Sequence, residues 1–243
     1  MRFRNEKLNQ LADLCVTLFN EEKNVPLLIS NFKEAKKWSP YLGNLILIDN
    51  GSTDKTWEIL KKHESDTILV GKLEFNEGYG GGAGRAIAES KNENVCLISA
   101  NNQYPFDQII KLLEIYVMQI SKSETKFLVK GLRVDRSDPQ SIRILSYVYT
   151  CLVSIAIGRK FADINGLPKI FRKEIVLEEL KHFPNNPAFD AAILLEAKRK
   201  DVRIIEIPIQ YLPRLHGNPS WSKGRFKTSL KMLSAILKYR FKR

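Results

Sequence analysis

Short apolar runs alternate with amphipathic stretches along the first half of the chain. The runs at 14–19, 45–49, 67–73 and 95–98 have the length and composition of buried strands. The stretches that begin at Pro26, at Thr53 or Asp54, near Gly84 and at Pro105 carry apolar residues at helical spacing. This alternation predicts β-α-β units, and therefore an α/β fold with a mostly parallel twisted sheet flanked by helices.

The second half of the chain has a less regular pattern. It predicts strands at 127–130 and 202–211 and helices at 142–157 and 188–200. Pro208 has no backbone N–H, which favours an edge position for the last strand. Because no linker or repeat interrupts the sequence, we expect one domain over residues 1–221, in two halves of about 10–120 and 121–221, and a terminal helix over 222–243.

Composition narrows the class of protein. The 243 residues are 44% hydrophobic and 27% charged, as in folded globular chains. Cys15, Cys96 and Cys151 form no C-x-x-C pair, which excludes a disulfide framework or structural zinc site and indicates a reducing compartment. The first 13 residues lack the apolar core of a signal peptide, and no run approaches the roughly 20 apolar residues that span a bilayer. We expect a cytoplasmic protein with no membrane-spanning helix.

Positive charge is concentrated at the end of the chain. The net charge is +12, yet residues 207–243 contain nine basic residues and no acidic one. In the terminal helix, Phe226, Leu230, Leu233, Leu237 and Phe241 form one stripe, and Lys227, Lys231, Lys238 and Lys242 form the adjacent one. This basic amphipathic helix either docks on the core with solvated lysines or binds an anionic membrane surface. No nucleic-acid module with interleaved aromatics is present in the sequence, so we expect no nucleic-acid partner.

Three polar clusters follow predicted strands, at residues 20–22, 49–54 and 99–105. Ligands of open parallel sheets bind at the carboxyl ends of the strands. A carboxylate beside a tight turn and a helix start, as at Asp49, suits hydrogen bonding to a ribose or a base. Taken singly, each cluster is also what turns and helix caps require.

In this order the clusters resemble motifs of the inverting family-two glycosyltransferases with the GT-A (nucleotide-diphospho-sugar transferase) fold. The resemblance is greatest to the dolichol-phosphate mannose synthase-like branch and to bacterial members that build cell-surface glycans. The segment Thr17-Leu-Phe-Asn-Glu21 resembles P-x-Y-N-E, and Ile48-Asp-Asn-Gly-Ser-Thr-Asp54 resembles V-D-D-G-S-T-D. Residues 76–85 resemble the Gly-rich helix entry of the family, and 163–169 and 212–221 resemble motifs of the bacterial members.

The resemblance implies an inverting hexosyltransferase-type enzyme, peripheral on the inner face of the membrane. It would transfer a sugar from a UDP- or GDP-sugar, bound by the first half, to a polyprenyl phosphate or lipid-linked saccharide at the second half. The implied donor contacts are Thr17, Phe19, Glu21, Asp49, Ser99, Asn101 and Gln103. The implied phosphate and acceptor contacts are Arg133, Arg214 and Lys223, with Arg136 as a further phosphate candidate.

Asp190 is the implied catalytic residue. A sugar hydroxyl acceptor must lose a proton to a positioned carboxylate, whereas a lipid phosphate is already ionised at neutral pH. Asp190 also fits a carboxylate that is favoured at a helix start by the helix dipole. Both interpretations stay open.

One family motif is replaced in this chain. Where relatives carry D-x-D, which holds Mg²⁺ or Mn²⁺ against the donor diphosphate, this sequence has Ser99-Ala100-Asn101. Asn101 is the remaining candidate metal ligand, and neutral side chains bind a hard cation poorly. Either the diphosphate brings its own metal, or basic side chains compensate, or the chain is a non-catalytic GT-A protein that binds a sugar nucleotide or a partner enzyme.

Two other nucleotide-binding classes fit less well. Gly78, Gly80 and Ala83 match the loose dinucleotide pattern G-x-G-x-x-G/A, but they follow the third strand, and no acidic residue lies about 20 positions on. The sequence has no G-x-x-x-x-G-K-[ST] segment, which excludes a P-loop hydrolase. The three histidines show no metal-ligand spacing.

Overall fold

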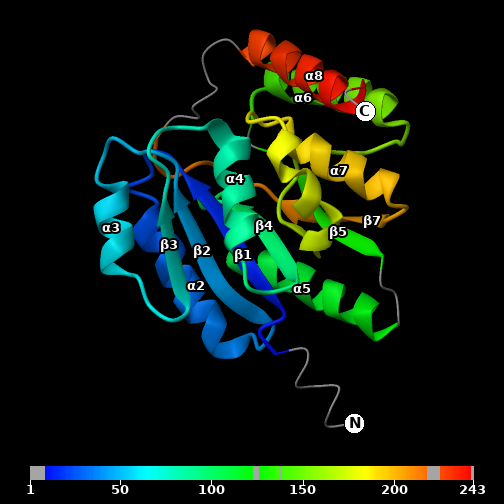
Figure 1. The fold of residues 1–243 in the computed structure, drawn as a ribbon. Helices are drawn as coiled ribbons and strands as arrows, with labels where there is room; N and C mark the ends of the chain where they lie inside the picture. Colours follow the sequence, from blue (N-terminus) through cyan, green and yellow to red (C-terminus); the bar gives the residue numbers. More distant parts are fainter. Residues whose placement is uncertain (1–8, 123–125, 137, 218–224, 242–243) are drawn as a thin grey trace.

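A seven-stranded sheet with the order β3-β2-β1-β4-β6-β5-β7 runs through the protein (Figure 1). The structure is a computed structural model that describes residues 9–122, 126–136, 138–217 and 225–241. The strands are β1 (Ala12–Leu18), β2 (Leu42–Asp49), β3 (Ile68–Lys72), β4 (Asn94–Ser99), β5 (Phe127–Val134), β6 (Lys169–Arg172) and β7 (Arg203–Gln210).

The first four strands are parallel, as the sequence predicts. β1 lies between β2 and β4 and is buried along almost its whole length, which explains its continuous apolar run. In this register Thr17 lies beside Ser99, and Leu18 lies beside Asp49. The three strands therefore end together, and the loops that follow them meet at one edge of the sheet.

β6 is the strand that the sequence analysis missed. It pairs antiparallel with both β4 and β5 and joins the two halves of the chain into one sheet. Four residues that begin with Lys169 and end with Arg172 give too short an apolar run to recognise. The sheet is therefore mixed rather than parallel throughout. β7 forms the edge of the sheet, the position expected from Pro208.

Helices cover both faces of the sheet (Figure 1). They are α2 (Val25–Trp38), α3 (Thr56–Lys62), α4 (Gly78–Glu89), α5 (Phe106–Ser121), α6 (Gln140–Ile157), α7 (Phe189–Arg199) and α8 (Arg225–Phe241), with short 3-10 turns η1 (Lys173–Ile175) and η2 (Leu177–His182).

α4 begins six residues before the expected start near Gly84, because the Gly-rich segment forms its first turns. A Cβ atom at Gly82 would lie 2.0 Å from Thr17 Oγ1, and one at Gly80 would lie 2.1 Å from the Pro184 carbonyl oxygen. The glycines let the helix pack directly on the end of β1 and on the segment before α7.

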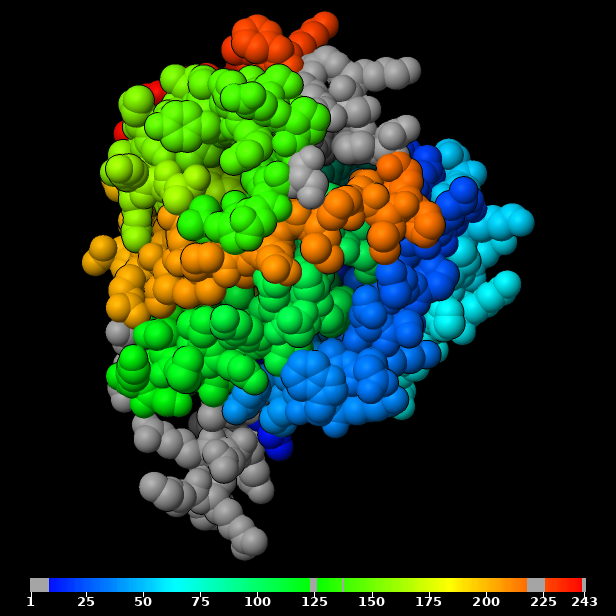
Figure 2. All heavy atoms as spheres, turned by 180° about the vertical axis from the view of Figure 1, so that it is seen from behind, coloured from blue at the N-terminus to red at the C-terminus, as the bar shows by residue number. Residues whose placement is uncertain are grey.

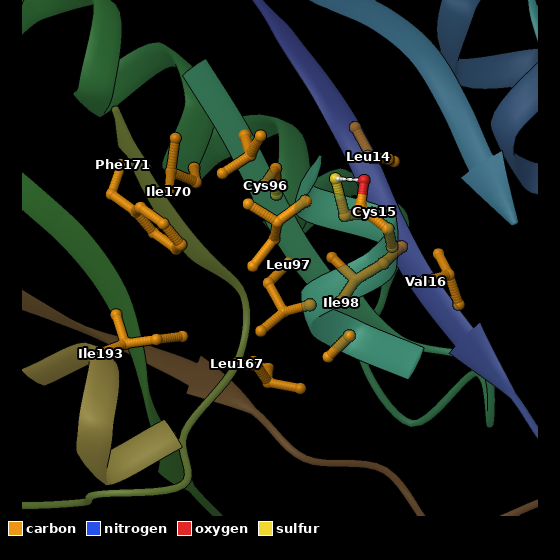
Figure 3. Packing of buried hydrophobic residues seen from close by; sticks show 14 of the residues in the cluster. Leu14, Cys15, Val16, Cys96, Leu97, Ile98, Leu167, Ile170, Phe171 and Ile193 are labelled. Atoms are coloured by element: carbon orange, nitrogen blue, oxygen red, sulfur yellow. Dashed lines mark hydrogen bonds between the residues drawn. The ribbon is translucent and has the colours of Figure 1, made fainter. Parts of the chain in front are cut away.

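The core is continuous across the sheet. Figure 3 shows Cys15, Leu97 and Ile170 among the buried side chains where β1, β4 and β6 run side by side. Full burial of one such aliphatic side chain stabilises the fold by about 1.5–3 kcal/mol.

Cys15 and Cys96 are free thiols in this core, and burial raises the pKa of both. They are packing residues rather than reactive groups.

α6 and α8 lie side by side at one end of the molecule, next to α7 (Figure 1). α8 packs on the core through Met232, Ile236 and Tyr239. Of the apolar stripe predicted for this helix, Leu233 packs against the core, whereas the other four side chains are exposed, with Phe226 at 68% and Phe241 at 73%.

α6 differs from the sequence-based expectation that no helix could span a bilayer. Among the described residues, α6 is a helix of 18 residues that is long and apolar enough to cross a membrane, and 28% of it is buried. Length and composition do not by themselves separate a spanning helix from a core helix.

Candidate functional site

A cavity of about 630 Å³ opens at the edge of the sheet where β1, β2 and β4 end. Thr17, Asn50 and Ser99 form its inner wall at the strand ends. Ile142 and Leu145 of α6 and Met232 of α8 line the opposite side. The cavity therefore has a polar end at the sheet and a wall from two helices in which these apolar side chains lie among polar ones, such as Thr228 and Ser229 of α8.

The loops after β1 and β2 are joined by hydrogen bonds. The backbone N–H of Asn20 donates to Ser52 Oγ at 3.0 Å, and the backbone N–H of Thr53 donates to Asn20 Oδ1 at 2.9 Å. The backbone N–H of Glu21 donates to Thr56 Oγ1 at 2.9 Å. These contacts hold the Asn20 backbone at φ +55°, which places Glu21 on the cavity wall.

Asp49 and its neighbour Asn50 have different positions relative to the cavity. Asn50 lines the cavity and holds the start of α4, because its amide donates to the Gly78 carbonyl oxygen at 2.8 Å and accepts from the Glu77 N–H at 3.0 Å. Asp49 is fully buried, and its Oδ1 accepts from the Ser52 N–H at 3.1 Å. Within the described residues its Oδ2 has no hydrogen-bond partner. The expected donor contact at Asp49 thus lies just behind the cavity wall.

The turn that replaces D-x-D is a closed network of neutral groups. Ser99 Oγ donates to Asn101 Oδ1 at 2.8 Å, and the Gln103 N–H donates to the same oxygen at 3.2 Å. Asn101 Nδ2 donates to Gln103 Oε1 at 2.6 Å, and the Tyr211 hydroxyl donates to that oxygen at 2.9 Å. Both amide oxygens that could face a cation already accept two hydrogen bonds each.

These residues do not fit a divalent metal ion. Mg²⁺ and Mn²⁺ favour carboxylate oxygens, and the turn offers two engaged amide oxygens and a hydroxyl. Within the described residues no group of three or more His, Cys, Asp or Glu side chains could hold a metal ion.

Glu21, a predicted donor contact, and Arg214, a predicted phosphate contact, form an ion pair with each other at the cavity wall. Arg214 Nη2 donates to Glu21 Oε1, and Arg214 Nε donates to the His216 carbonyl oxygen at 2.6 Å. Asn24 Nδ2 donates to Glu21 Oε2 at 2.5 Å. This pair fastens the segment after β7 across the loop that follows β1; Figure 2 shows that segment in orange against the blue N-terminal part.

Arg133 is held in a buried ion pair. Its guanidinium donates to both carboxylate oxygens of Asp163, at 2.7 and 2.8 Å. Burial alone would raise the pKa of Asp163, but Arg133 holds it below the usual value of 3.8. Arg136, by contrast, pairs with the more exposed Asp138 at 2.8 Å and donates to Ser146 Oγ of α6 at 3.0 Å.

Asp190 faces a lysine that sequence reasoning missed. Lys169 Nζ donates to Asp190 Oδ1 at 2.6 Å, and both side chains are buried. Burial lowers the pKa of Lys169 to about 8, although Asp190 opposes this change. Burial also raises the pKa of Asp190 above its usual value, against the effect of Lys169. The sequence signal was a lysine in the otherwise apolar run Pro168-Lys-Ile-Phe171.

Four unpaired polar atoms surround the deep part of the cavity. The hydroxyl oxygens of Tyr79, Tyr149 and Thr17 and the Oδ1 of Asn165 are buried and have no hydrogen-bond partner among the described residues. All four residues line the cavity. The sequence did not single out Tyr79, Tyr149 or Asn165 as candidate site residues. Buried polar atoms require partners, which the hydroxyl groups of a ligand or water would supply.

The structure thus gathers most of the predicted residues around one cavity. Those lining it are Thr17, Phe19, Glu21, Ser99, Asn101, Arg133, Asp190 and Arg214. Gln103 lies behind Asn101 and joins it to the segment after β7, since its Nε2 donates to the Leu212 carbonyl oxygen at 3.0 Å. Lys223 lies outside the described residues.

Sheet order, flanking helices and the cavity at the strand ends define a GT-A fold. Solved structures agree: glucosyl-3-phosphoglycerate synthase from Mycobacterium tuberculosis, solved with Mn²⁺, UDP and glucosyl-3-phosphoglycerate, has a TM-score of 0.70 and 15% identity. The match covers 97% of this chain and 81% of that one. A second mycobacterial protein of known structure has a TM-score of 0.72 at 14% identity, and the match covers 97% of this chain and 76% of that one.

Residues 13–117 match the model of the family described as Glycosyl transferase family 2. A similar curated protein is the dodecaprenyl-phosphate galacturonate synthase of Rhizobium johnstonii, which is 26% identical over 100% of this chain and 71% of its own length. The undecaprenyl-phosphate 4-deoxy-4-formamido-L-arabinose transferase of Yersinia pestis is 23% identical over 91% of this chain. That match spans 65% of the Yersinia protein.

Proposed function

We propose that the chain is a glycosyltransferase that moves a sugar from a nucleotide-sugar donor to a polyprenyl phosphate in cell-surface glycan synthesis. The observation that carries this proposal is a cavity that joins a polar end at β1, β2 and β4 to apolar side chains of α6 and α8, namely Ile142, Leu145 and Met232. A donor suits the first end, and an acceptor with a hydrocarbon chain suits the second. The names of the curated relatives support the same acceptor class.

The reaction is a single displacement with inversion at the anomeric carbon. An ionised phosphate oxygen of the acceptor attacks that carbon, and its bond to the donor diphosphate breaks, so that the nucleoside diphosphate leaves with the bonding electron pair. Because the attacking oxygen is already ionised, no side chain has to remove a proton. The ion pair with Lys169 agrees with this chemistry, since it engages Asp190 Oδ1 instead of leaving the carboxylate free.

The surface around the second end of the cavity suits a membrane. α6 packs against α8, and its exposed apolar side chains include Tyr147 and Ile155. Lys227, Lys231 and Lys238 are exposed on α8. Apolar side chains and lysines together favour an anionic leaflet, where each lysine contributes about 1 kcal/mol. We propose a peripheral position on the cytoplasmic face, with the cavity beside the lipid.

A transfer assay tests the proposal. Purified protein is incubated with a panel of labelled UDP- and GDP-sugars and with undecaprenyl phosphate, and the lipid extract is analysed for a sugar phosphate ester. The expected product is a lipid-linked monosaccharide with the anomeric configuration opposite to that of the donor. Transfer only to a sugar hydroxyl, with loss of activity in Asp190→Asn, would contradict the phosphate acceptor.

A second candidate is a non-catalytic GT-A protein that binds a sugar nucleotide or a partner enzyme. It is favoured by the neutral turn at Ser99 and Asn101 and by the ion pairs that engage Arg133, Arg136 and Arg214. Calorimetric binding of a donor, with neither transfer nor hydrolysis for any acceptor, would support this candidate over the enzyme.

A further inference from the structure

The polar end of the cavity has the donor groups of an anion site in the place where a cation would be expected. Both amide oxygens of the turn, those of Asn101 and Gln103, already accept two hydrogen bonds each. A metal ion bound there would have to break these bonds and would receive no carboxylate in return. The turn is therefore closed to a cation by its own hydrogen bonds, and not only by its lack of charge.

Guanidinium groups lie next to this turn. The Tyr211 hydroxyl bonds to Gln103, and the ring of Tyr211 has Arg133 at 5.3 Å and Arg136 at 5.9 Å from its centroid. Tyr211 thus joins the neutral turn to two cations on the same wall of the cavity. Guanidinium groups bind phosphate oxygens directly, with no need for an intervening metal.

Of these two cations, Arg136 is the one that can exchange its partner. Arg133 is bound through two hydrogen bonds to Asp163, whose side chain is 6% exposed, and its departure would leave the buried carboxylate without a charged hydrogen-bond donor. Arg136 pairs with Asp138, whose side chain is 20% exposed and can be hydrated in its place. Arg214 is engaged with Glu21 across the loop that follows β1.

We infer that the Ser99–Gln103 turn holds no divalent cation, and that the donor diphosphate binds directly to N–H groups with Arg136 as its main cationic contact. This inference rests on the proposed function for the identity of the ligand, a nucleoside diphosphate. It does not depend on that function for the chemistry of the site, which recognises a diphosphate anion. Arg136 exchanges Asp138 for the ligand, and the buried pair of Arg133 and Asp163 stays intact.

Titration calorimetry with UDP, GDP and inorganic pyrophosphate tests the inference, each measured in EDTA and in Mn²⁺. In the wild type, EDTA should change each dissociation constant by less than about threefold, since no metal-dependent bond is lost. Arg136→Gln should weaken binding by about tenfold or more, the loss of one charge-assisted hydrogen-bonding group. The control Arg143→Gln, at an exposed position of α6 outside the cavity, should leave binding within about twofold.

A gain-of-function variant and a metal titration complete the test. The double variant Ser99→Asp, Asn101→Asp should bind the same ligands only with Mn²⁺, because its carboxylates repel the diphosphate unless a cation lies between them. Electron paramagnetic resonance should detect bound Mn²⁺ in this variant and not in the wild type.

Three outcomes distinguish this inference from the proposed function. One Mn²⁺ per wild-type chain, or a tenfold loss of wild-type affinity in EDTA, would overturn the inference and leave the glycosyltransferase intact. Pyrophosphate binding that depends on Arg136, without binding of any nucleotide, would keep the inference and contradict the proposed donor. Failure of all three anions to bind would overturn the inference.

Discussion

The buried pair of Arg133 and Asp163 gives the sharpest test of how the cavity wall is held. Replacing Arg133 with Met keeps much of the side-chain volume and removes the guanidinium. Asp163 then keeps the backbone N–H of Asn165 at 3.2 Å, but it loses both charged hydrogen bonds. Lys130 Nζ donates to the carbonyl oxygens of Gly131 and Asp163 and pairs with Glu206, so none of its hydrogen bonds reaches the Asp163 carboxylate.

The size of the effect follows from burial. Two unit charges about 4 Å apart interact by about 4 kcal/mol at an effective dielectric constant of 20. Removing one partner of a buried pair costs about 3–5 kcal/mol, because the other charge stays buried. For a domain of this size each kcal/mol lowers the melting temperature by about 2–4 °C, so we expect a decrease of about 6–20 °C at pH 7.5.

The pH dependence has a defined sign. In the wild type the pKa of Asp163 lies below its unfolded value of 3.8, so its contribution to stability is present above that pH and is lost on acidification. In Arg133→Met, burial without the guanidinium raises the pKa of Asp163, and protonation then relieves the buried charge. The stability difference between the two proteins should therefore shrink from pH 7.5 to pH 4.5 by at least about 1.4 kcal/mol.

Urea unfolding at both pH values measures this difference. Arg143→Met, at an exposed position, is the matched control and should change stability by no more than about 0.5 kcal/mol. Adding Asp163→Asn to Arg133→Met should restore part of the loss at pH 7.5, since no buried charge remains. A loss below about 1 kcal/mol at pH 7.5, or a difference that does not change with pH, would refute the buried ion pair as the cause.

Two further predictions concern packing and the membrane. Gly80→Ala should destabilise the fold by about 1–3 kcal/mol in thermal unfolding, because the new Cβ would lie 2.1 Å from a backbone oxygen. The control Gly84→Ala, whose new Cβ would lie 3.6 Å from its nearest neighbour, should be neutral or stabilising. Equal effects of the two substitutions would contradict the packing of α4. Replacing Lys227, Lys231 and Lys238 with Gln should weaken sedimentation with anionic liposomes by about a hundredfold, or about 3 kcal/mol, and unchanged retention would contradict a charged membrane contact.

Much of the fold could be predicted because β1, β2 and β4 are buried on both faces. Their continuous apolar runs and the helices between them admit few arrangements, and the edge position of β7 followed from Pro208. β6 could not be predicted, because it contains Lys169. This lysine is buried together with its ion-pair partner Asp190, which lies 21 residues later in the chain. The start of α4 was misplaced, since glycines that weaken an isolated helix are here required by a close approach to β1.

The site was predictable as a set of loops but not as a set of contacts. Sequence order placed residues 20–22, 49–54 and 99–105 at one sheet edge, and the register of β1 brings them together. Ion pairing could not be inferred, because Glu21 and Arg214 are 193 residues apart. Tyr79 and Tyr149 were missed for a similar reason: a tyrosine in a helix is usually a packing residue, and only the cavity shows that their hydroxyls lack partners.

The proposed function requires that the ends of β1, β2 and β4 form the binding site of a nucleotide-sugar donor. Hydrogen-exchange mass spectrometry on the whole chain, with and without a saturating UDP- or GDP-sugar, tests it most directly. With a donor that binds, we expect slower exchange at residues 17–22, 50–54 and 99–103. Unchanged exchange in these three segments with every sugar nucleotide, or protection confined to another surface, would contradict it.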